Sequence, residues 1–163
     1  MACAKSEFTK LVAQLDYSLF IVTAAARGHQ AGCLIGFATQ LSIHPPRFLA
    51  GLSMKNRTYR VAREAGVLVI HFVPEEAEEL AALFGGETGD EIDKFARCRW
   101  RQGPEGAPVL EDLENWFAGR ILERLHFGDH CGFLLEPIAG EVGRSSSPLT
   151  FRRAKAIEPG HEP

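Results

Sequence analysis

The sequence predicts a β-rich α+β domain in which an antiparallel barrel is accompanied by a few short helices. Six or more segments have strand length and are rich in β-branched, aromatic or other apolar residues. These segments follow one another at hairpin spacing instead of alternating with helices, which favours an antiparallel barrel over a doubly wound parallel sheet. Only three short segments show helical periodicity.

The size and composition are those of one globular domain. A chain of 163 residues can bury roughly 70% of its unfolded surface. The hydrophobic and charged fractions, 45% and 24%, are ordinary for a soluble protein. The formal net charge of -3 gives no general attraction to nucleic acid or to an anionic membrane. No apolar run approaches the ~20 residues of a membrane helix, and the first ten residues lack the apolar core of a signal peptide. We therefore expect a cytoplasmic domain spanning 1–163, with its core at about 17–153, a polar tail at 155–163, and neither nucleic acid nor membrane as a partner.

A helix and a β-hairpin are predicted first. Residues 6–15 place four apolar side chains on one helical face, with Ser6 as a plausible N-cap: Phe8, Leu11, Val12 and Leu15. Residues 17–26 and 31–40 are two strand-like runs joined by a turn at Arg27, Gly28 and His29. The second run contains Gly32 and Gly36, which are costly in a strand unless something approaches the backbone closely.

The middle of the chain alternates between short elements. Pro45 and Pro46 are expected to keep the backbone extended and to prevent a helix. Asn56 is the predicted N-cap of the next helix, and Gly66 is predicted to close it. The elements expected here are a strand at 47–53, a helix at 56–65, a strand at 67–73 and a helix at 74–84.

The last part is predicted to be mainly strand. Residues 85–93 read as a loop, and 94–100 and 109–110 are too short to assign. Two apolar runs, 116–125 and 131–137, are predicted to pair across Phe127-Gly128-Asp129-His130. A final strand is expected at 148–152.

Polar and cationic side chains gather after the 47–53 strand: Ser53, Lys55, Asn56, Arg57 and Thr58. A phosphate monoester needs N–H and O–H donors together with positive charge. A helix that begins at Asn56 would add unpaired backbone amides and the positive end of its dipole. The alternative is an ordinary capped helix with a solvated basic first turn.

The preceding run, 32–39, suits a flat and largely apolar ligand. Small residues such as Gly36 and Ala38 let a backbone approach a ring closely and aim amides at its polar edge. Together with a phosphate site, this order of features indicates flavin mononucleotide (FMN). The alternative is that 32–39 is simply a strand of the barrel core.

In the order of its motifs, the chain resembles the flavin reductase-like family, the FMN-binding split-barrel proteins. The resemblance covers about residues 17–153. Its motifs are Gly32, Ser42-Ile43-His44-Pro45-Pro46, Ser53 with Thr58, Ala65-Gly66, Lys94-Phe95, Trp100 and Gly128-Asp129-His130.

The resemblance implies a Greek-key split barrel that forms a homodimer, with the flavin near the subunit interface. It implies reduction of FMN, with FAD possible, by NADH or NADPH, and supply of reduced flavin to a monooxygenase. Carried over by position, one group of residues would line the ring and ribityl chain: Leu34, Ile35, Gly36, Phe37, Ala38 and Thr39. A second group would hold the phosphate: Ser53, Asn56, Arg57 and Thr58. Lys94 and Phe95 would close over the flavin. Many relatives have Thr-Ala-Ser-Ser where this chain has residues 34–37, so only backbone amides could bind the ring edge here.

His130 is the candidate catalytic residue. Gly-Asp is a common turn pair, so the histidine after it could also be an ordinary surface residue. The resemblance places His130 beside the flavin, where a nicotinamide would stack. Hydride transfer needs alignment and close approach more than an acid or base, so we assign His130 a positioning role, with Asp129 fixing its tautomer.

Other chemistry finds little support in the sequence. The four cysteines form no CxxC pair, and Cys33 and Cys131 are expected to be buried as small hydrophobic residues. No histidine spacing suggests a metal site. GxGxxG and GxxxxGK[ST] are both absent, so a nicotinamide nucleotide would bind in an open groove against the flavin.

The sequence alone is compatible with three functions. The first is an NAD(P)H-dependent flavin reductase. The second is a flavin-binding electron-transfer module that a partner protein reduces. The third is a split-barrel protein with another cofactor, such as haem or a deazaflavin.

Overall fold

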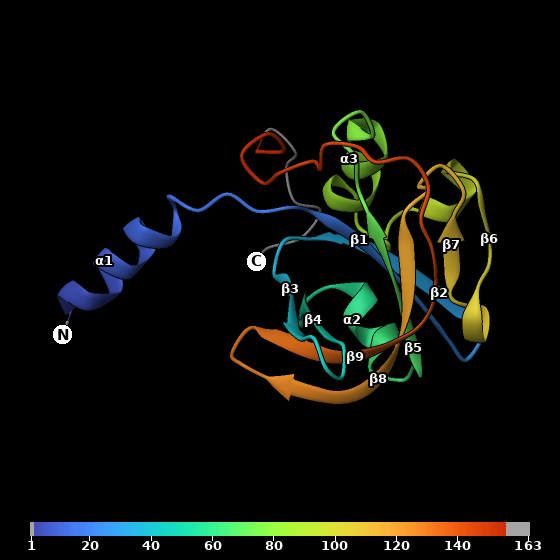
Figure 1. The fold of residues 1–163 in the computed structure, drawn as a ribbon, viewed down its shortest axis with the longest axis horizontal. Coiled ribbons are helices and arrows are strands. Elements are labelled where there is room, and N and C mark those ends of the chain that lie inside the picture. The colour runs from blue at the N-terminus through green and yellow to red at the C-terminus, as the bar shows by residue number, and fades with distance from the viewer. Residues whose placement is uncertain (1, 156–163) are drawn as a thin grey trace.

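The computed structural model describes residues 2–155 and consists mainly of antiparallel strands (Figure 1). The polar tail predicted at 155–163 therefore lies almost wholly outside the described residues. The helices are α1 (Ala2–Val12), α2 (Arg57–Ala62) and α3 (Glu78–Gly86), with 3-10 turns η1 (Lys94–Arg97) and η2 (Pro104–Gly106). The strands are β1 (Phe20–Ala26), β2 (His29–Ile35), β3 (Ala38–Ser42), β4 (Arg47–Ser53), β5 (Val67–Phe72), β6 (Trp100–Gln102), β7 (Pro108–Leu110), β8 (Trp116–His126) and β9 (His130–Glu141). Among the described helices, none has the length and apolar character needed to cross a membrane.

Seven strands form one sheet in the order β2-β1-β5-β8-β9-β4-β3, and all of its pairs are antiparallel. Its two outermost strands, β2 and β3, are joined by only Gly36 and Phe37. Because two residues cannot span the width of a flat seven-stranded sheet, the sheet must curl until its edges meet. The Gly51 amide of β4 donates to the Phe37 carbonyl at 2.7 Å and fastens this seam. The predicted β-rich barrel is confirmed.

The barrel interior is filled by alternate residues of its strands. Phe20, Val22 and Ala24 of β1 point inward and pack against Phe133 and Leu135 of β9. The residues between them point outward, because successive side chains of a strand face opposite sides. Ile21 thus joins a second core beneath α3. Cys33 and Cys131 are both buried, as predicted.

Several predicted elements are confirmed closely. β4 has the predicted bounds, and β5, β8 and β9 lie where strands were expected. The β1–β2 hairpin turns at Arg27 and Gly28, which have φ of 51° and 77°. Two successive positive φ values give a turn whose twist matches that of the flanking strands.

One predicted strand is wrong in a way that matters for the site. The run 31–40 is not continuous, because β2 ends at Ile35 and β3 begins at Ala38 on the opposite edge of the sheet. The chain leaves one strand and enters the other at the barrel seam. Residues 43–46 form the turn before β4, and the bond between His44 and Pro45 is cis.

Smaller differences concern the ends of elements. The predicted helix 56–65 is only six residues long, and the predicted helix 74–84 begins later, at Glu78. Residues 148–152 form no strand and contribute only isolated bridges, Pro148 with Pro74 and Thr150 with Ser18. The unassigned region around 94–110 forms η1, η2 and the two-stranded β6–β7 ribbon.

Candidate functional site

Three neighbouring hollows lie along β2, the first turn of α2 and the β8–β9 turn, and every predicted site residue lines one of them. We call them the central cleft, of about 300 Å³, the apolar chamber, of about 430 Å³, and the lateral pocket, of about 300 Å³. Phe37, Gly51 and His130 are shared by the central cleft and the apolar chamber.

The structure divides the predicted residues among these hollows. The central cleft is lined by Leu34, Ile35, Gly36, Phe37, Ser53, Asn56 and His130. The apolar chamber is lined by Phe37, Ala38, Thr39 and His130. The lateral pocket is lined by Arg57, Thr58, Lys94 and Phe95. The predicted ring-binding run is therefore split at the barrel seam, and the predicted phosphate cluster is split between Asn56 and Arg57.

Aromatic rings close one wall of the central cleft. Tyr17 and Phe151 stack with their centroids 4.9 Å apart and their planes 15° from parallel. The Tyr17 ring lies so close to Gly36 that a Cβ there would collide with it. The close approach expected at Gly36 is therefore made by the protein's own ring. At Gly32 the same holds, since a Cβ would lie 2.7 Å from the Phe84 ring.

Ser53 brings an unsatisfied hydroxyl to the central cleft. It is the last residue of β4, pairs with His130 of β9 and is 9% exposed. Within residues 2–155, its Oγ is the one buried side-chain oxygen or nitrogen without a hydrogen-bond partner. A buried polar group without a partner costs free energy. Acceptor oxygens of a ligand in the cleft would remove that cost, so the site fits a phosphorylated group.

Asn56 shapes the backbone next to Ser53. Its side-chain oxygen accepts from the Thr58 amide at 2.9 Å, and its own amide donates to the Ser53 carbonyl at 3.0 Å. The predicted N-cap is confirmed. α2 has only six residues, so the dipole expected to support a phosphate is that of a short helix.

His130 stands between the central cleft and the apolar chamber. Its Nδ1 lies 2.7 Å from the Asp129 Oδ1, and this hydrogen bond lowers the pKa of the Asp129 carboxyl. The carboxylate leaves Nε2 as the nitrogen available to a ligand. The His130 ring lies 5.0 Å from the Phe37 ring at a tilt of 56°. Phe37 and His130 thus form the partition between the two hollows.

Charged groups in the lateral pocket are already engaged within the protein. Arg57 Nη1 lies 3.8 Å from the Asp90 Oδ1, and Arg60 Nη2 contacts both carboxylate oxygens of Asp90 at 2.6 and 2.7 Å. The buried Lys94 ammonium donates to the carbonyls of Gly32 and Phe84 at 3.1 and 3.0 Å. Burial lowers the pKa of Lys94. Its contacts fasten η1 to β2 and α3.

Phe95 and Thr58 complete the lateral pocket. The Phe95 ring meets those of Phe84 and Trp100 edge-on, at centroid distances of 5.7 and 5.8 Å. Thr58 is buried, and its side chain hydrogen-bonds the Cys33 thiol. This bond acts to lower the pKa of the thiol, but burial has the larger effect and raises it. Lys94 and Phe95 therefore line the lateral pocket and do not cover the central cleft.

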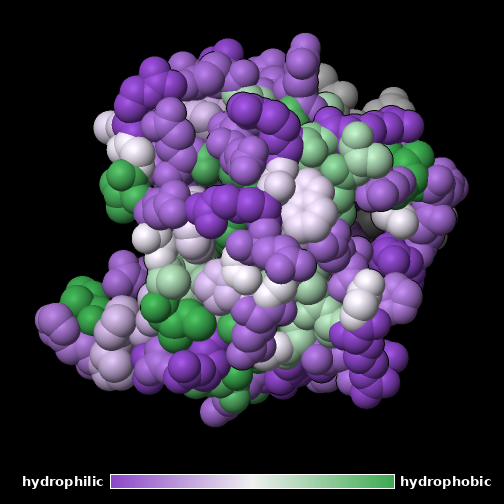
Figure 2. Space-filling view, turned by 90° about the vertical axis from the view of Figure 1, so that its right-hand side faces the viewer, coloured by the Kyte–Doolittle hydropathy of each residue, from purple (hydrophilic) through white to green (hydrophobic). Residues whose placement is uncertain are grey.

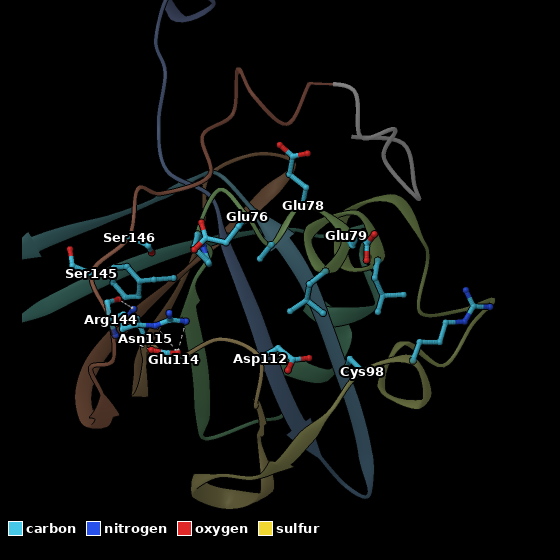
Figure 3. Close-up of a pocket in the computed structure, with 16 residues that line it drawn as sticks. Glu76, Glu78, Glu79, Cys98, Asp112, Glu114, Asn115, Arg144, Ser145 and Ser146 are labelled. Atoms are coloured by element: carbon cyan, nitrogen blue, oxygen red, sulfur yellow. Dashed lines mark hydrogen bonds and ion pairs between the residues drawn. The ribbon is translucent and has the colours of Figure 1, made fainter.

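A larger groove of about 860 Å³ lies elsewhere, between the start of α3 and the segment that follows β9 (Figure 3). None of the predicted site residues lines it. Glu76, Glu79 and Asp112 line it, Glu78 at its rim is paired with Arg153 at 2.9 Å, and Arg144 is paired with Glu114 at 3.1 Å. The excess of carboxylates over cationic groups disfavours an anionic nucleotide there. The three smaller hollows remain the candidate site.

Some residues of the central cleft were not predicted. Tyr17, Cys33 and Gly85 line it together with two residues near the end of the described chain, Phe151 and Ala154. Tyr17 and Phe151 are 134 residues apart (151 − 17), so no local pattern could connect them. Cys33 belonged to the predicted strand, but its apolar context indicated only burial.

Known proteins resemble this chain in sequence and in structure. A family model described as "Flavin reductase like domain" matches residues 12–158. An FMN reductase (NADH) RutF of Agrobacterium fabrum is 33% identical over 145 residues, which cover 89% of this chain and 83% of that protein. An FMN reductase (NADH) RutF of Variovorax paradoxus is 26% identical over 147 residues, covering 90% and 81%. The crystal structure of a flavin reductase domain protein from Arthrobacter sp. FB24 superposes with a TM-score of 0.82 at 23% identity, covering 91% of each chain.

Proposed function

Because the chain belongs to the flavin reductase-like family, we propose that it is an NAD(P)H-dependent flavin reductase. The relatives named FMN reductase (NADH) support FMN as the flavin and NADH as the reductant. FAD and NADPH are the corresponding alternatives. The unpartnered Ser53 hydroxyl in the central cleft is the structural observation that carries this proposal.

FMN would lie in the central cleft with its phosphate toward Ser53 and Asn56. Ser53 would donate its hydroxyl hydrogen, which has no acceptor among the described residues. Arg57 and Thr58, which follow Asn56 directly, would hold the far side of the phosphate, with Arg57 turning from Asp90. Leu34 to Phe37 would carry the ring and ribityl chain in the central cleft, with Ala38 and Thr39 in the adjoining apolar chamber. Lys94 and Phe95, in the lateral pocket, would lie beyond the phosphate end and not over the ring.

The bound flavin would supply the acceptor for the hydride that the nicotinamide gives up. The protein's part is then to bind, to orient and to exclude water. His130 would present its Nε2 edge to the nicotinamide, while Asp129 holds the ring by its Nδ1. The neighbouring apolar chamber, with Phe37, Leu49 and Phe127 in its wall, offers a dry surface for that second ring.

The proposal includes a setting for the enzyme. We infer a homodimer, supported by the exposed apolar side chains of β3 and the β8–β9 turn: Leu41 at 57% and Phe127 at 67% exposure. We also infer that the reduced flavin serves a monooxygenase. The open cleft favours this role because a product that must leave needs a path out. A cytoplasmic location, where nicotinamide nucleotides are abundant, belongs to the same proposal.

The test is to purify the chain, record its absorbance spectrum with and without added FMN, and follow NADH oxidation. We expect NADH oxidation that requires flavin. Flavin binding without turnover of NADH or NADPH would indicate the electron-transfer module instead, and no flavin binding at all would contradict both functions.

A second experiment tests the role of His130. The variant His130→Ala should raise the KM for NADH and leave the FMN dissociation constant nearly unchanged. His29→Ala, which changes an exposed histidine in the β1–β2 hairpin, is the control. Loss of FMN binding in His130→Ala would show that His130 holds the flavin and does not position the nicotinamide.

A further inference from the structure

The loop between α3 and η1 places a carboxylate against the start of α2. Asp90 belongs to this loop and lines the lateral pocket together with Arg57 and Thr58. Its Oδ1 lies 2.6 Å from the Arg60 Nη2 and 3.8 Å from the Arg57 Nη1, and its Oδ2 lies 2.7 Å from the same Arg60 nitrogen. The carboxylate therefore stands between two guanidinium groups on one side of the helix.

An exposed ion pair does not by itself mark a binding site. Hydrophilic side chains dominate the face of the molecule that Figure 2 shows, and most exposed pairs contribute little to stability. The pairs made by Asp90 differ in their position. Arg57 follows Asn56 directly, and Asn56 lines the central cleft. Asp90 thus engages two cationic groups where the proposed phosphate end of the central cleft adjoins the lateral pocket.

The loop holds the Asp90 carboxylate in this position. The Thr88 hydroxyl accepts from the Asp90 amide at 3.3 Å. The backbone of Gly89 lies against the Arg57 side chain, since a Cβ there would lie 3.0 Å from the Arg57 Cδ. The hydrogen bond from Arg60 is the main reason why the pKa of the Asp90 carboxyl is lowered. Asp90 therefore presents a negative charge to the lateral pocket at neutral pH.

FMN and FAD differ in what they would place beyond the phosphate end of the central cleft. FMN ends in a single phosphate, whereas FAD continues from that phosphate through a second one to an adenosine. With the first phosphate at Ser53 and Asn56, the adjoining hollow is the lateral pocket, which has a volume of about 300 Å³. A second phosphate that entered it would need hydrogen-bond donors and positive charge.

The cationic groups along that path are already engaged. Asp90 holds both Arg57 and Arg60, and the buried Lys94 ammonium donates to two backbone carbonyls. A second phosphate would therefore meet the Asp90 carboxylate, and like charges repel. A single phosphate avoids this conflict, because Arg57 can turn toward it while Asp90 keeps Arg60, its closer partner.

We propose that Asp90 is a specificity-determining residue: its carboxylate occupies the place of a second phosphate, so the site accepts a flavin with a single terminal phosphate and discriminates against FAD. This inference rests on the flavin reductase function proposed above and names its preferred substrate class. It concerns the binding of flavins, which is measured without NADH.

The test compares two variants that each remove one negative charge from the loop. Asp90→Asn removes the charge that faces the two arginines. Glu91→Gln removes it from the next residue, which is exposed and lines the same pocket. Equilibrium dialysis with FMN and with FAD gives both dissociation constants. We expect the wild-type protein to bind FMN at least about tenfold more tightly than FAD, Asp90→Asn to bind FAD about tenfold more tightly than the wild-type protein does, and Glu91→Gln to keep the wild-type ratio.

A double variant tests whether the released arginine holds the second phosphate. Arg60→Met alone should leave FAD binding weak, because Asp90 remains in place. Combined with Asp90→Asn, it should remove most of the gain in FAD affinity, because Arg60 is the closer of the two groups that Asp90 releases. Full FAD affinity in the double variant would show that the gain does not come from a contact with Arg60 and would contradict the assigned place of the second phosphate.

Two further results would overturn the role of Asp90. Equal affinities of the wild-type protein for FMN and FAD would show that the adenosine half of FAD avoids this loop. Equal changes in FMN and FAD affinity in Asp90→Asn, or the same change of ratio in Glu91→Gln, would show a general effect of charge. Both results leave FMN-dependent NADH oxidation untouched, whereas binding of neither flavin would contradict the proposed reductase function and this inference together.

Discussion

The Ser53 hydroxyl has opposite effects on the stability of the free protein and on the binding of the proposed ligand. Its Oγ is buried and unpartnered in the free protein, which costs stability. The same atom lies beside the space assigned to a phosphate, where a hydrogen bond to a charged acceptor is worth about 1.5–3 kcal/mol. A single hydroxyl can therefore weaken the fold and strengthen ligand binding.

Replacing Ser53 separates these two effects. Ser53→Ala should weaken FMN binding by about 10–100-fold and leave the flavin-free protein as stable as before or more so. Fluorescence titration with FMN and urea unfolding measure the two quantities. Ser145→Ala, in the distant acidic groove, should change neither. Unchanged FMN affinity in Ser53→Ala would show that the hydroxyl does not face the phosphate.

At the scale of single elements, α2 shows how a cap and a binding group can coincide. Asn56 begins this six-residue helix by accepting from the Thr58 amide, and it also lines the central cleft. A carboxylate can make the same cap but repels a phosphate. The two roles of Asn56 therefore respond differently to substitution.

Two substitutions at Asn56 distinguish these roles. Asn56→Ala should lower the free energy of unfolding by about 1 kcal/mol through loss of the cap. Asn56→Asp should retain the stability but weaken FMN binding at least tenfold, because like charges would face each other. Urea unfolding and FMN titration at low salt provide the measurements. Gln102→Glu on β6 adds the same charge on an exposed strand outside the three hollows, and FMN binding by Asn56→Asp equal to that of this control would contradict the phosphate assignment.

Elements stabilised by their own residues were predictable from sequence. β4 is bounded by two prolines and by the polar cluster at its end, and Asn56 marks the start of α2 by its side-chain chemistry. The break between β2 and β3 was not predictable, since Gly36 and Phe37 lie within a continuous apolar run. It arises because the barrel closes at that point, which is a property of all seven strands together.

In the candidate site, too, residues marked by local motifs were predictable, and contacts made by the whole fold were not. Sequence motifs predicted Ser53, Asn56 and His130, and the fold brings these residues to one cleft. The aromatic wall of Tyr17 and Phe151 was missed because it depends on contact between the two ends of the described chain. Asn56 lines the central cleft, whereas Arg57 lines the lateral pocket and pairs there with Asp90. The loop position of Asp90 gave no sign in the sequence that it contacts α2.

At the scale of the whole molecule, His71 joins the barrel to the β6–β7 ribbon. Its Nδ1–H donates to the Ile21 carbonyl at 3.0 Å, and its Nε2 accepts from the Leu110 amide at 3.0 Å. A carbonyl can only accept and an amide can only donate, so both bonds require the neutral ring. Burial lowers the pKa of His71 to about 4, against about 6.5 for an exposed histidine.

This difference predicts a pH dependence of stability. The unfolded chain binds a proton at His71 below about pH 6.5, whereas the folded protein does so only near pH 4. The His71 contribution is therefore complete above pH 6.5 and is lost as the pH falls toward 4, by about 3 kcal/mol in all. Urea unfolding between pH 4 and 8 measures the slope.

The contribution of His71 is isolated by comparison with two variants. His71→Gln should be less stable at neutral pH, with a shallower dependence on pH between 4 and 6.5. His29→Gln, at an exposed position, should retain the wild-type slope. Equal slopes in His71→Gln and the wild-type protein would show that other groups cause the acid sensitivity.

The two-residue seam at Gly36 and Phe37 also bears on how the barrel is made during translation. β2 and β3 emerge from the ribosome one after the other, yet β1, β5, β8, β9 and β4 must take their places between them. β9 is the last of these and ends at Glu141, so a nascent chain cannot close the barrel before β9 has been synthesised. Its assembly is dominated by contacts between distant parts of the chain, which makes closure slow.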